Sequence, residues 1–205
     1  WVGDNHFMRA KGEIDPREDI LAYMNFLGGG EIEEKRMHAL VDDGPRAISF
    51  YEANGLAFAQ VPGVVDHYFG VAKGARGPGR TLEAQLVSGF DLGDWRDKVR
   101  TPKDAPYCIT AGEQIAWGGI NRYATWDQAL LAERREKDMR GKGAGLVTQL
   151  VKALLARKIP IALETPVDSL LTENGRVTGV RLAGGERISA RRGVVIATGG
   201  YEWNA

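Results

Sequence analysis

The sequence has little cysteine, little histidine and no net charge. Cys108 is the single cysteine among 205 residues, which excludes an internal disulfide framework and a multi-cysteine zinc site. One thiol is typical of a reducing compartment, so we expect a cytoplasmic protein. His6 and His38 have no metal-ligand spacing to other His, Cys or acidic residues, so we expect no metal.

Lys and Arg number 27, as do Asp and Glu, so neither sign of charge is in excess. Proteins that bind nucleic-acid backbones need surplus positive charge, and we therefore expect no nucleic-acid partner. No apolar run approaches the roughly 20 residues that a membrane-spanning helix needs. Hydrophobic residues make up 43% and charged residues 26%, which indicates a globular chain.

Glycine is abundant, at 27 of 205 residues or about 13%, against a usual share of roughly 7%. Glycine permits positive φ and close approach of a ligand to the backbone. The chain starts at Trp1 and ends at Ala205, just after an apolar run and a glycine pair. A buried strand and a glycine turn normally lead into another element, so we expect an internal piece of a longer protein.

Residues 1–55 are predicted to be helical. Asp15-Pro16-Arg17-Glu18 has the pattern of a capping box with proline at the first helical position, and Gly28-Gly29-Gly30 ends that helix. A second helix is expected over 31–41, and a third starts at Asp43-Gly44-Pro45 and ends at Asn54-Gly55.

Residues 56–140 are predicted to be mostly irregular, since glycine and proline interrupt them repeatedly. Short extended pieces are expected up to Gly93. Thr125-Trp126-Asp127-Gln128 predicts a helix start, and a charged helix follows to about Arg140, with residues 133–138 on a solvated face.

Residues 141–205 combine a helix, a β-meander and a terminal strand. The helix is expected over 146–157, short strands over 159–163, 167–172, 176–182 and 186–190, and a buried strand over 194–197. Asn174-Gly175 between apolar runs is a strong hairpin signal, because both turn residues need positive φ. These elements predict an α/β fold with α+β character.

Three motifs each have a functional and a structural interpretation. The glycine-rich run 141–145 could bind phosphate at a helix start, but its spacing matches no known fingerprint, which favours a plain loop. Val194 to Gly200 is either a nucleotide contact at a strand end or a simple turn. In Asp66-His67-Tyr68, a His beside a Tyr could transfer protons, although a packed or surface pair is the commoner arrangement.

Taken together, these motifs resemble a known family. The last sixty residues are similar to the flavin domain of the fumarate reductase/succinate dehydrogenase flavoprotein superfamily. The front resembles its 3-ketosteroid Δ1-dehydrogenase branch. The segments that carry the resemblance are Trp1–His6, Asp15–Glu18, Asp66–Tyr68, Gly79–Glu83, Leu92–Trp95, Gly145–Val147, Glu164–Val167, Leu171–Leu182 and Arg192–Asn204.

The resemblance implies a partial FAD-binding domain of the two-dinucleotide-binding type across 1–205. The family's amino-terminal βαβ unit would precede Trp1, and its substrate-capping domain would follow Ala205. By position, Val167 would contact adenine through its backbone. Three further residues, Ala197, Thr198 and Gly199, would pass close to the adenosine or pyrophosphate. Trp1 and Asn5 would lie near the flavin.

The resemblance also implies the chemistry. An FAD-dependent dehydrogenase of this kind removes two hydrogens from adjacent carbons next to a ketone, with a steroid-like or other small ketone as substrate. A Tyr of the branch's Asp-Tyr-Tyr-like stretch assists there. Tyr68 is our candidate and His67 is the alternative, because the alignment is ambiguous by one residue.

Two other functions remain open at this point. One is a fumarate reductase/succinate dehydrogenase-like flavoprotein, whose arginine proton donor would lie beyond Ala205. The other is a non-catalytic fragment or interaction module without cofactor. The isolated chain is expected to be inactive and to bind FAD weakly or not at all. We expect the run 194–197 to form a wall against an adenine nucleotide, and a run found facing solvent, or filled by side chains, would overturn the oxidoreductase assignment.

Overall fold

The computed structural model describes residues 1–103 and 106–200, and it divides the chain into two compact units. Unit 1 spans Trp1–Ile159 and unit 2 starts at Pro160. The expectation of one incomplete domain across the chain stays a prediction. Within the described ranges, no helix combines the length and the apolar character that crossing a membrane requires.

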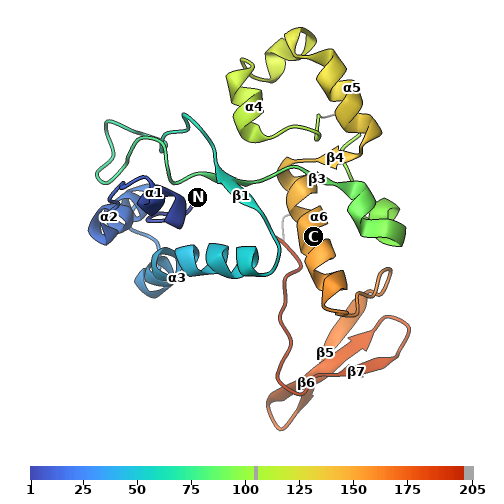
Figure 1. Ribbon diagram of the computed structural model, residues 1–205. Helices are drawn as coiled ribbons and strands as arrows, with labels where there is room; N and C mark the ends of the chain where they lie inside the picture. Colours follow the sequence, from blue (N-terminus) through green and yellow to red (C-terminus); the bar gives the residue numbers. More distant parts are fainter. Residues whose placement is uncertain (104–105, 201–205) are drawn as a thin grey trace. The chain divides into compact units, whose positions relative to one another are not determined.

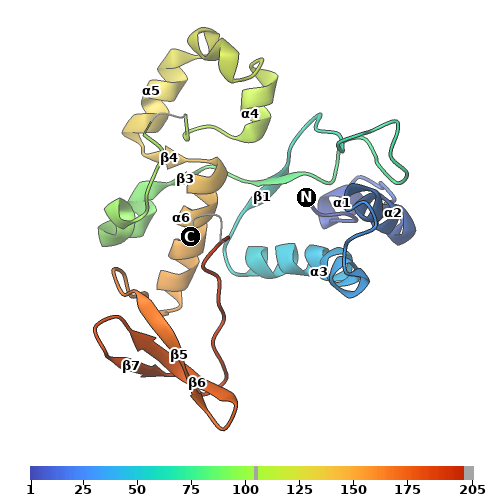
Figure 2. The ribbon, with the colours of Figure 1, turned by 180° about the vertical axis from the view of Figure 1, so that it is seen from behind.

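Unit 1 contains the helices and two small antiparallel ladders (Figures 1 and 2). Its α-helices are α1 (His6–Ala10), α2 (Arg17–Leu27), α3 (Glu34–Ala53), α4 (Ala111–Ala116), α5 (Gln128–Glu136) and α6 (Lys142–Ala156). Its 3₁₀ segments are η1 (Gly89–Lys98) and η2 (Ile120–Thr125). Strand β1 (Phe58–Gln60) pairs with β2 (Leu82–Ala84), and β3 (Val87–Ser88) pairs with β4 (Met139–Arg140).

The predicted first 55 residues are helical as expected, but two details were wrong. Asp15 does not cap α2, because its carboxylate is bonded to the Asp4 amide and to Arg80 instead. The second and third helices are one helix, α3, which continues through Pro45. Proline inside a helix normally breaks it. Here, buried Met37 and Val41 anchor the helix before the proline, as the packing of Ile48 does after it.

Two apolar clusters hold unit 1 together. Leu56, Phe58 and Ala84 of the β1–β2 region pack with side chains from α3 and α6. A second cluster consists of Cys108, Ile109, Trp126 and Leu131. The predicted irregular stretch 56–140 therefore folds around packed side chains. It also contains α4, which the sequence analysis missed although Thr110 and Glu113 form a capping box at its start.

The charged helix was predicted with the wrong ends. Asp127 caps α5, whereas the Thr125 hydroxyl bonds back to the Arg122 carbonyl. The helix stops at Glu136, because Asp138 takes positive φ and turns inward to bond Arg140. The predicted solvated face was also wrong at Asp138, which is buried.

Helix α6 starts at Lys142, four residues earlier than predicted, and β4 precedes it directly. Two glycines of the run 141–145 serve close packing. A Cβ at Gly141 would lie 2.2 Å from the Ile109 carbonyl oxygen, and one at Gly145 would lie 2.7 Å from that of Arg140. The plain loop that the sequence favoured for this run is wrong, because Gly141 is the N-cap of α6 and residues 142–145 form its first turn.

Unit 2 is a three-stranded antiparallel meander of β5 (Val167–Glu173), β6 (Arg176–Leu182) and β7 (Arg187–Ser189). Asn174 and Gly175 both have positive φ, 50° and 76°, so the predicted hairpin turn is confirmed. Strands β6 and β7 pair so closely at position 179 that only glycine fits there, because an added Cβ would lie 2.2 Å from the Ile188 carbonyl oxygen.

Two predicted strands of unit 2 are absent from the described residues. Residues 159–163 and 194–197 are not strands, and Val195 in the second run is 91% exposed. A buried strand needs hydrogen-bonded neighbours along its edges and cover on both faces. Within the described chain nothing pairs with 194–197, so its apolar character alone does not make it a buried strand.

Candidate functional site

The centre of unit 1's candidate site is Arg80, a buried arginine just before β2. Its guanidinium is 1% exposed and donates two hydrogen bonds to Asp15, from Nε at 2.9 Å and from Nη2 at 2.6 Å. Nη1 donates to Asp66 at 2.6 Å and to the Gly74 carbonyl at 3.0 Å. The planar, multi-donor guanidinium suits such a buried site. Arg80 therefore joins the start of α2 to the loop 63–79.

Two aromatic rings cover this arginine. The Trp1 ring centre lies 5.1 Å from the Arg80 Cζ and the Tyr23 ring centre lies 5.8 Å from it, both within cation–π distance. The Trp1 Nε1 also donates to Asp66 Oδ1 at 2.6 Å. Asp66 thus accepts from both Trp1 and Arg80, and its side chain is buried. The amino-terminal residue and the Asp66 loop are fixed to each other.

The electrostatics of the cluster favour charged Asp15 and neutral Tyr23. Burial alone would raise the pKa of Asp15, but hydrogen bonds from Arg80 and the Asp4 amide outweigh it and hold that pKa below its usual value. Burial, helped by the Asp66 charge, raises the pKa of Tyr23. Its phenol therefore stays protonated and donates to the His67 carbonyl at 2.9 Å.

Asp66 to Phe69 form a tight turn that presents Tyr68. The Phe69 amide donates to the Asp66 carbonyl at 3.1 Å, and Tyr68 has a φ of 60°. Left-handed φ is uncommon for a bulky residue. The Tyr68 side chain is 62% exposed, and its ring meets the Phe26 ring edge-on at 5.8 Å. The turn therefore directs a phenol toward solvent beside an aromatic ring.

Asn5 lies in the same region, where its side chain stabilises the local fold. Its side-chain amide donates to the Val2 and Gly79 carbonyls, and its Oδ1 accepts from the Met8 amide as the N-cap of α1. Asn5 is fully buried. A role for Asn5 near the flavin stays a prediction, and its side chain is already fully engaged within the protein.

The other predicted cofactor residues belong to unit 2. Val167 starts β5 and is 56% exposed, while Ala197, Thr198 and Gly199 are exposed and lie outside any helix or strand. A Cβ added at Gly199, where φ is 84°, would meet no other atom within 4 Å. The backbone there is open enough for a ligand to lie against it.

The structure thus brings Trp1, His67 and Tyr68 together around Asp66 and Arg80, with Asn5 bonded to the residue before Arg80. The set at 167 and 197–199 lies in the other unit, which is described separately. The sequence analysis missed Arg80, Asp15 and Tyr23 as parts of the site. Arg80 and Asp15 lie 65 residues apart, so no local pattern could reveal their pairing.

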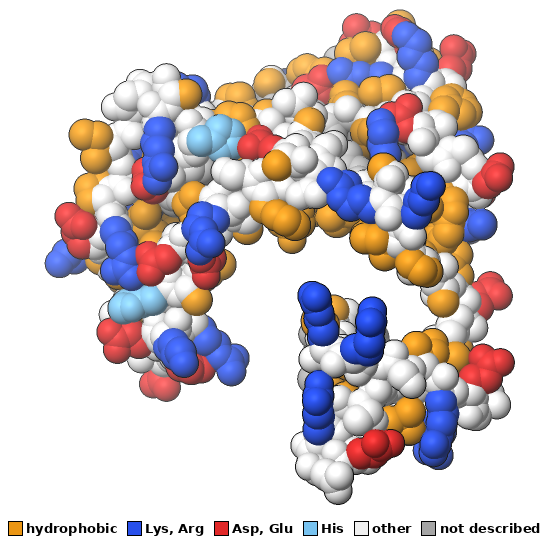
Figure 3. All heavy atoms as spheres, turned by 60° about the horizontal axis from the view of Figure 1, so that its bottom comes forward, with side chains coloured by type: hydrophobic (Ala, Val, Ile, Leu, Met, Phe, Trp, Pro, Cys, Tyr) orange, Lys and Arg blue, Asp and Glu red, His pale blue; other side chains and the backbone are white. Residues whose placement is uncertain are grey.

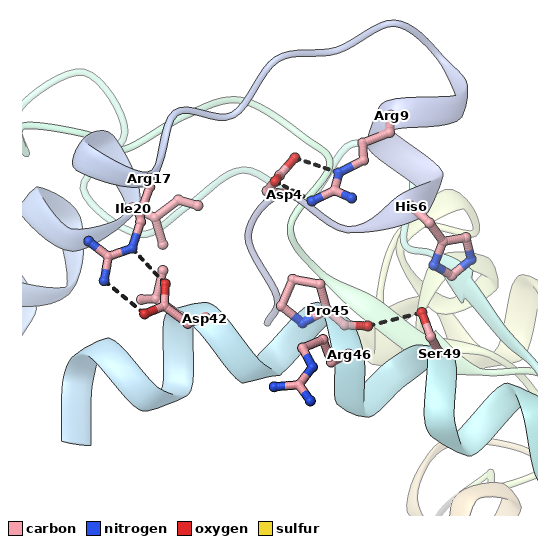
Figure 4. A pocket seen from close by; sticks show the side chains of 10 residues that line it. Asp4, His6, Arg9, Arg17, Ile20, Asp42, Pro45, Arg46 and Ser49 are labelled. Atoms are coloured by element: carbon pink, nitrogen blue, oxygen red, sulfur yellow. Dashed lines mark hydrogen bonds and ion pairs between the residues drawn. The ribbon is translucent and has the colours of Figure 1, made fainter. Parts of the chain in front are cut away.

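A separate cavity of about 540 Å³ lies between α1, α2 and α3 (Figure 4). Asp4, His6, Arg9, Arg17, Asp42 and Arg46 contribute to its lining. Its arginines already have acidic partners: Arg9 pairs with Asp4, Arg17 with Asp42 and Arg46 with Asp43. These pairs neutralise the cavity, and the predicted site residues do not line it.

Surface charge is mixed around these features. On the face shown in Figure 3, basic, acidic and hydrophobic side chains lie intermingled over most of the surface, and several basic side chains lie together on the lobe at the lower right. This agrees with the zero net charge.

The curated proteins that are similar to this chain are dehydrogenases named for oxo-substituted ring compounds. The chain is 35% identical to a 4-oxocyclohexanecarboxylate 2-dehydrogenase of Sinomonas cyclohexanicum, over all of this chain and 36% of that protein. It is 28% identical to a 3-oxosteroid 1-dehydrogenase of Mycobacterium tuberculosis strain H37Rv, over all of this chain and 40% of that protein. The chain therefore spans well under half the length of these curated relatives.

A solved structure has the same fold. The 3-ketosteroid Δ1-dehydrogenase of Sterolibacterium denitrificans, in complex with 1,4-androstadiene-3,17-dione, matches with a TM-score of 0.81 and 28% identity. The match covers 98% of this chain and 40% of that one. The resemblance inferred from the motifs and the predicted partial FAD-binding fold are both confirmed. The FAD binding domain family model matches residues 1–204, so the chain belongs to this family of FAD-binding proteins.

Proposed function

We propose that the protein is an FAD-dependent dehydrogenase that removes hydrogen from two adjacent carbons next to a ring ketone. The observation that carries this proposal is the match of the whole chain to dehydrogenases whose names specify cyclic ketones. Val195 and Ile196 face solvent, so the expected adenine wall gives no support. The expectation that such exposure would overturn the oxidoreductase assignment was wrong, because the family match supports the assignment without this run. The function therefore rests on family membership and on the Tyr68 region.

In such a reaction the ketone acidifies the carbon beside it. A base takes the proton, and hydrogen bonds to the ketone oxygen stabilise the developing enolate charge. FAD, when bound, supplies the acceptor for the hydride. The chain's own residues would orient the ring and assist the proton transfer.

Tyr68 is the residue that we propose for the proton transfer. Its side chain is exposed, and it stands among exposed apolar side chains that suit an apolar ring, namely Phe26, Val65, Phe69 and Val71. A phenol with an ordinary pKa near 10 needs help from neighbours to act as a base. Tyr68 would therefore assist together with other groups, and His67 remains the alternative.

For the cofactor, we propose backbone contacts at Val167, Ala197, Thr198 and Gly199. The open backbone at Gly199 supports this assignment. Trp1 and Asn5 would lie near the flavin, and a contact from Asn5 would have to come from its backbone because its side chain is engaged.

The substrate that we propose is a cyclic ketone, either a steroid-like ketone or a smaller cyclohexanone. The relatives named above act, by name, on both kinds. These names favour a ketone over the fumarate reductase/succinate dehydrogenase alternative. We also propose a cytoplasmic location, which the single cysteine supports.

The test is Tyr68→Phe in the full-length holoenzyme, with cyclohexanone carboxylates and 3-ketosteroids as substrates. Loss of the hydroxyl should lower kcat by roughly 10- to 10,000-fold, the range for acid–base contributions. Tyr51→Phe, a half-exposed tyrosine on α3, is the matched control and should leave kcat unchanged. Unchanged turnover in Tyr68→Phe together with a large loss in His67→Ala would assign the proton transfer to His67. Unchanged turnover in both variants would overturn the proposal that this turn assists the proton transfer.

A further inference from the structure

Tyr68 has a backbone conformation that its own side chain disfavours. Its φ is 60°, and left-handed backbone costs a non-glycine residue free energy. Such conformations persist only when surrounding contacts enforce them, and they concentrate at functional sites. The contacts that enforce this one are therefore informative.

Tyr23 supplies one of those contacts from α2. Its hydroxyl donates to the carbonyl of His67, the residue directly before Tyr68, at 2.9 Å. The Tyr23 side chain is 2% exposed, so the phenol is fixed by the packing around it. The hydrogen bond holds the peptide group that joins His67 to Tyr68, and with it the direction in which Tyr68 leaves the turn.

Asp66 fixes the other end of the turn. Its Oδ2 accepts from Arg80 at 2.6 Å and from the Arg76 amide at 3.1 Å, and its own amide donates to the Arg76 carbonyl at 3.0 Å. Phe26, one turn after Tyr23 on α2, holds the Tyr68 ring by edge contact. Helix α2 thus contacts the turn at its backbone and at the exposed ring.

We propose that Tyr23 is a positioning residue, which acts on the reaction through Tyr68 by holding the His67–Tyr68 peptide group. The inference rests on the proposed function of Tyr68. Tyr23 itself is buried and does not touch substrate in this arrangement. It is a neutral hydrogen-bond donor, because burial raises its pKa.

A double-mutant cycle in the full-length holoenzyme tests the inference. Tyr23→Phe keeps the ring and removes only the hydroxyl. It should lower kcat by about 10- to 100-fold, with a smaller change in KM, because small misplacements of a reacting group are costly. In a Tyr68→Phe background the same change should alter kcat less than about twofold, since Tyr23 then has no reacting hydroxyl to position.

Two controls separate positioning from general destabilisation. Ile109→Val, in the buried Cys108–Leu131 cluster, should lower the melting temperature without lowering kcat. The second control is temperature: the cycle is repeated at a temperature at which circular dichroism shows Tyr23→Phe to be folded, so that a variant of low stability is still assayed in its folded state.

The outcomes distinguish the two claims. Equal losses from Tyr23→Phe with and without the Tyr68 hydroxyl would overturn the positioning role while leaving Tyr68 as the assisting residue. No effect of Tyr68→Phe alone would remove Tyr68 from the proton transfer, and the positioning role with it, while the dehydrogenase function would be overturned only if the unmodified holoenzyme did not oxidise cyclic ketones. A large loss that appears only when the Tyr68 hydroxyl is present supports both.

Discussion

The guanidinium of Arg80 and the carboxylate of Asp15 form a two-point ion pair in which each side chain is only 1% exposed. Asp66 adds a second buried carboxylate to the same guanidinium. Arg80 is thus the shared partner of two buried carboxylates, and Arg76 lies 3.5 Å from Asp15 at the edge of the same cluster. Removing Arg80 would take the two-point partner from Asp15 and the 2.6 Å ion pair from Asp66.

Arg80→Met is therefore expected to destabilise the protein strongly. Leaving a buried charge unpaired costs about 3–5 kcal/mol. Urea unfolding should show this loss in the free energy of unfolding. Arg46→Met is the control, because the Arg46–Asp43 pair is exposed and exposed pairs contribute about 0–1 kcal/mol. Equal losses in the two variants would show that the buried network does not stabilise unit 1.

The local elements were largely readable from the sequence. The Asn174-Gly175 turn was predictable because its two residues determine their own backbone conformation. The single helix through Pro45 was not, because its continuity depends on Met37, Val41 and Ile48 packing against other segments. The run 194–197 was misjudged because an apolar sequence predicts burial only where other strands are present to pair with it.

The site was predictable only in part. The resemblance of motifs selected Trp1, Asn5 and Tyr68, and the structure places them in one region of unit 1. Arg80 lies in the segment Gly79–Glu83 that carries the resemblance, but nothing in the sequence indicates what it pairs with, and Tyr23 belongs to none of those segments. Tyr23 lies 44 residues from His67 and Arg80 lies 65 residues from Asp15, and only the folded chain brings these pairs within hydrogen-bond distance.

The pH dependence of stability should report the Asp15–Arg80 pair. The pKa of Asp15 is lowered from 3.8 in the folded protein, so the pair stabilises above that value and its contribution is lost as pH falls through the folded pKa. Asp15→Asn should be less stable than the unmodified protein at pH 7, and the difference should shrink below about pH 4.

Urea unfolding at a series of pH values from 7 to 3 measures this difference. Asp43→Asn, at an exposed position, is the control and should differ little from the unmodified protein throughout. A difference between Asp15→Asn and the unmodified protein that stays constant down to pH 3 would contradict the ion-pair account. Such a pH-independent difference in stability would instead indicate that the asparagine packs poorly at position 15.

Gly74 supports the same network through its backbone. Its carbonyl accepts from Arg80, its φ is 77°, and a Cβ placed there would lie 2.0 Å from the Asp19 carbonyl oxygen on α2. Gly74→Ala therefore faces two costs, the left-handed backbone and a collision with a helix that cannot move without disturbing Tyr23. Gly63 has a φ of 72° and no atom within 4 Å of an added Cβ, so Gly63→Ala faces the first cost alone.

Gly63→Ala should lose about 1–2 kcal/mol in the free energy of unfolding, which is the cost of left-handed backbone for alanine. Gly74→Ala should lose clearly more, because a contact of 2.0 Å forces backbone atoms apart. Urea midpoints compared at an unchanged m-value measure both losses. Similar losses in the two variants would mean that α2 and the loop 63–79 are free to separate. The packing of Gly74 against α2 would then not contribute to holding Tyr68 in place.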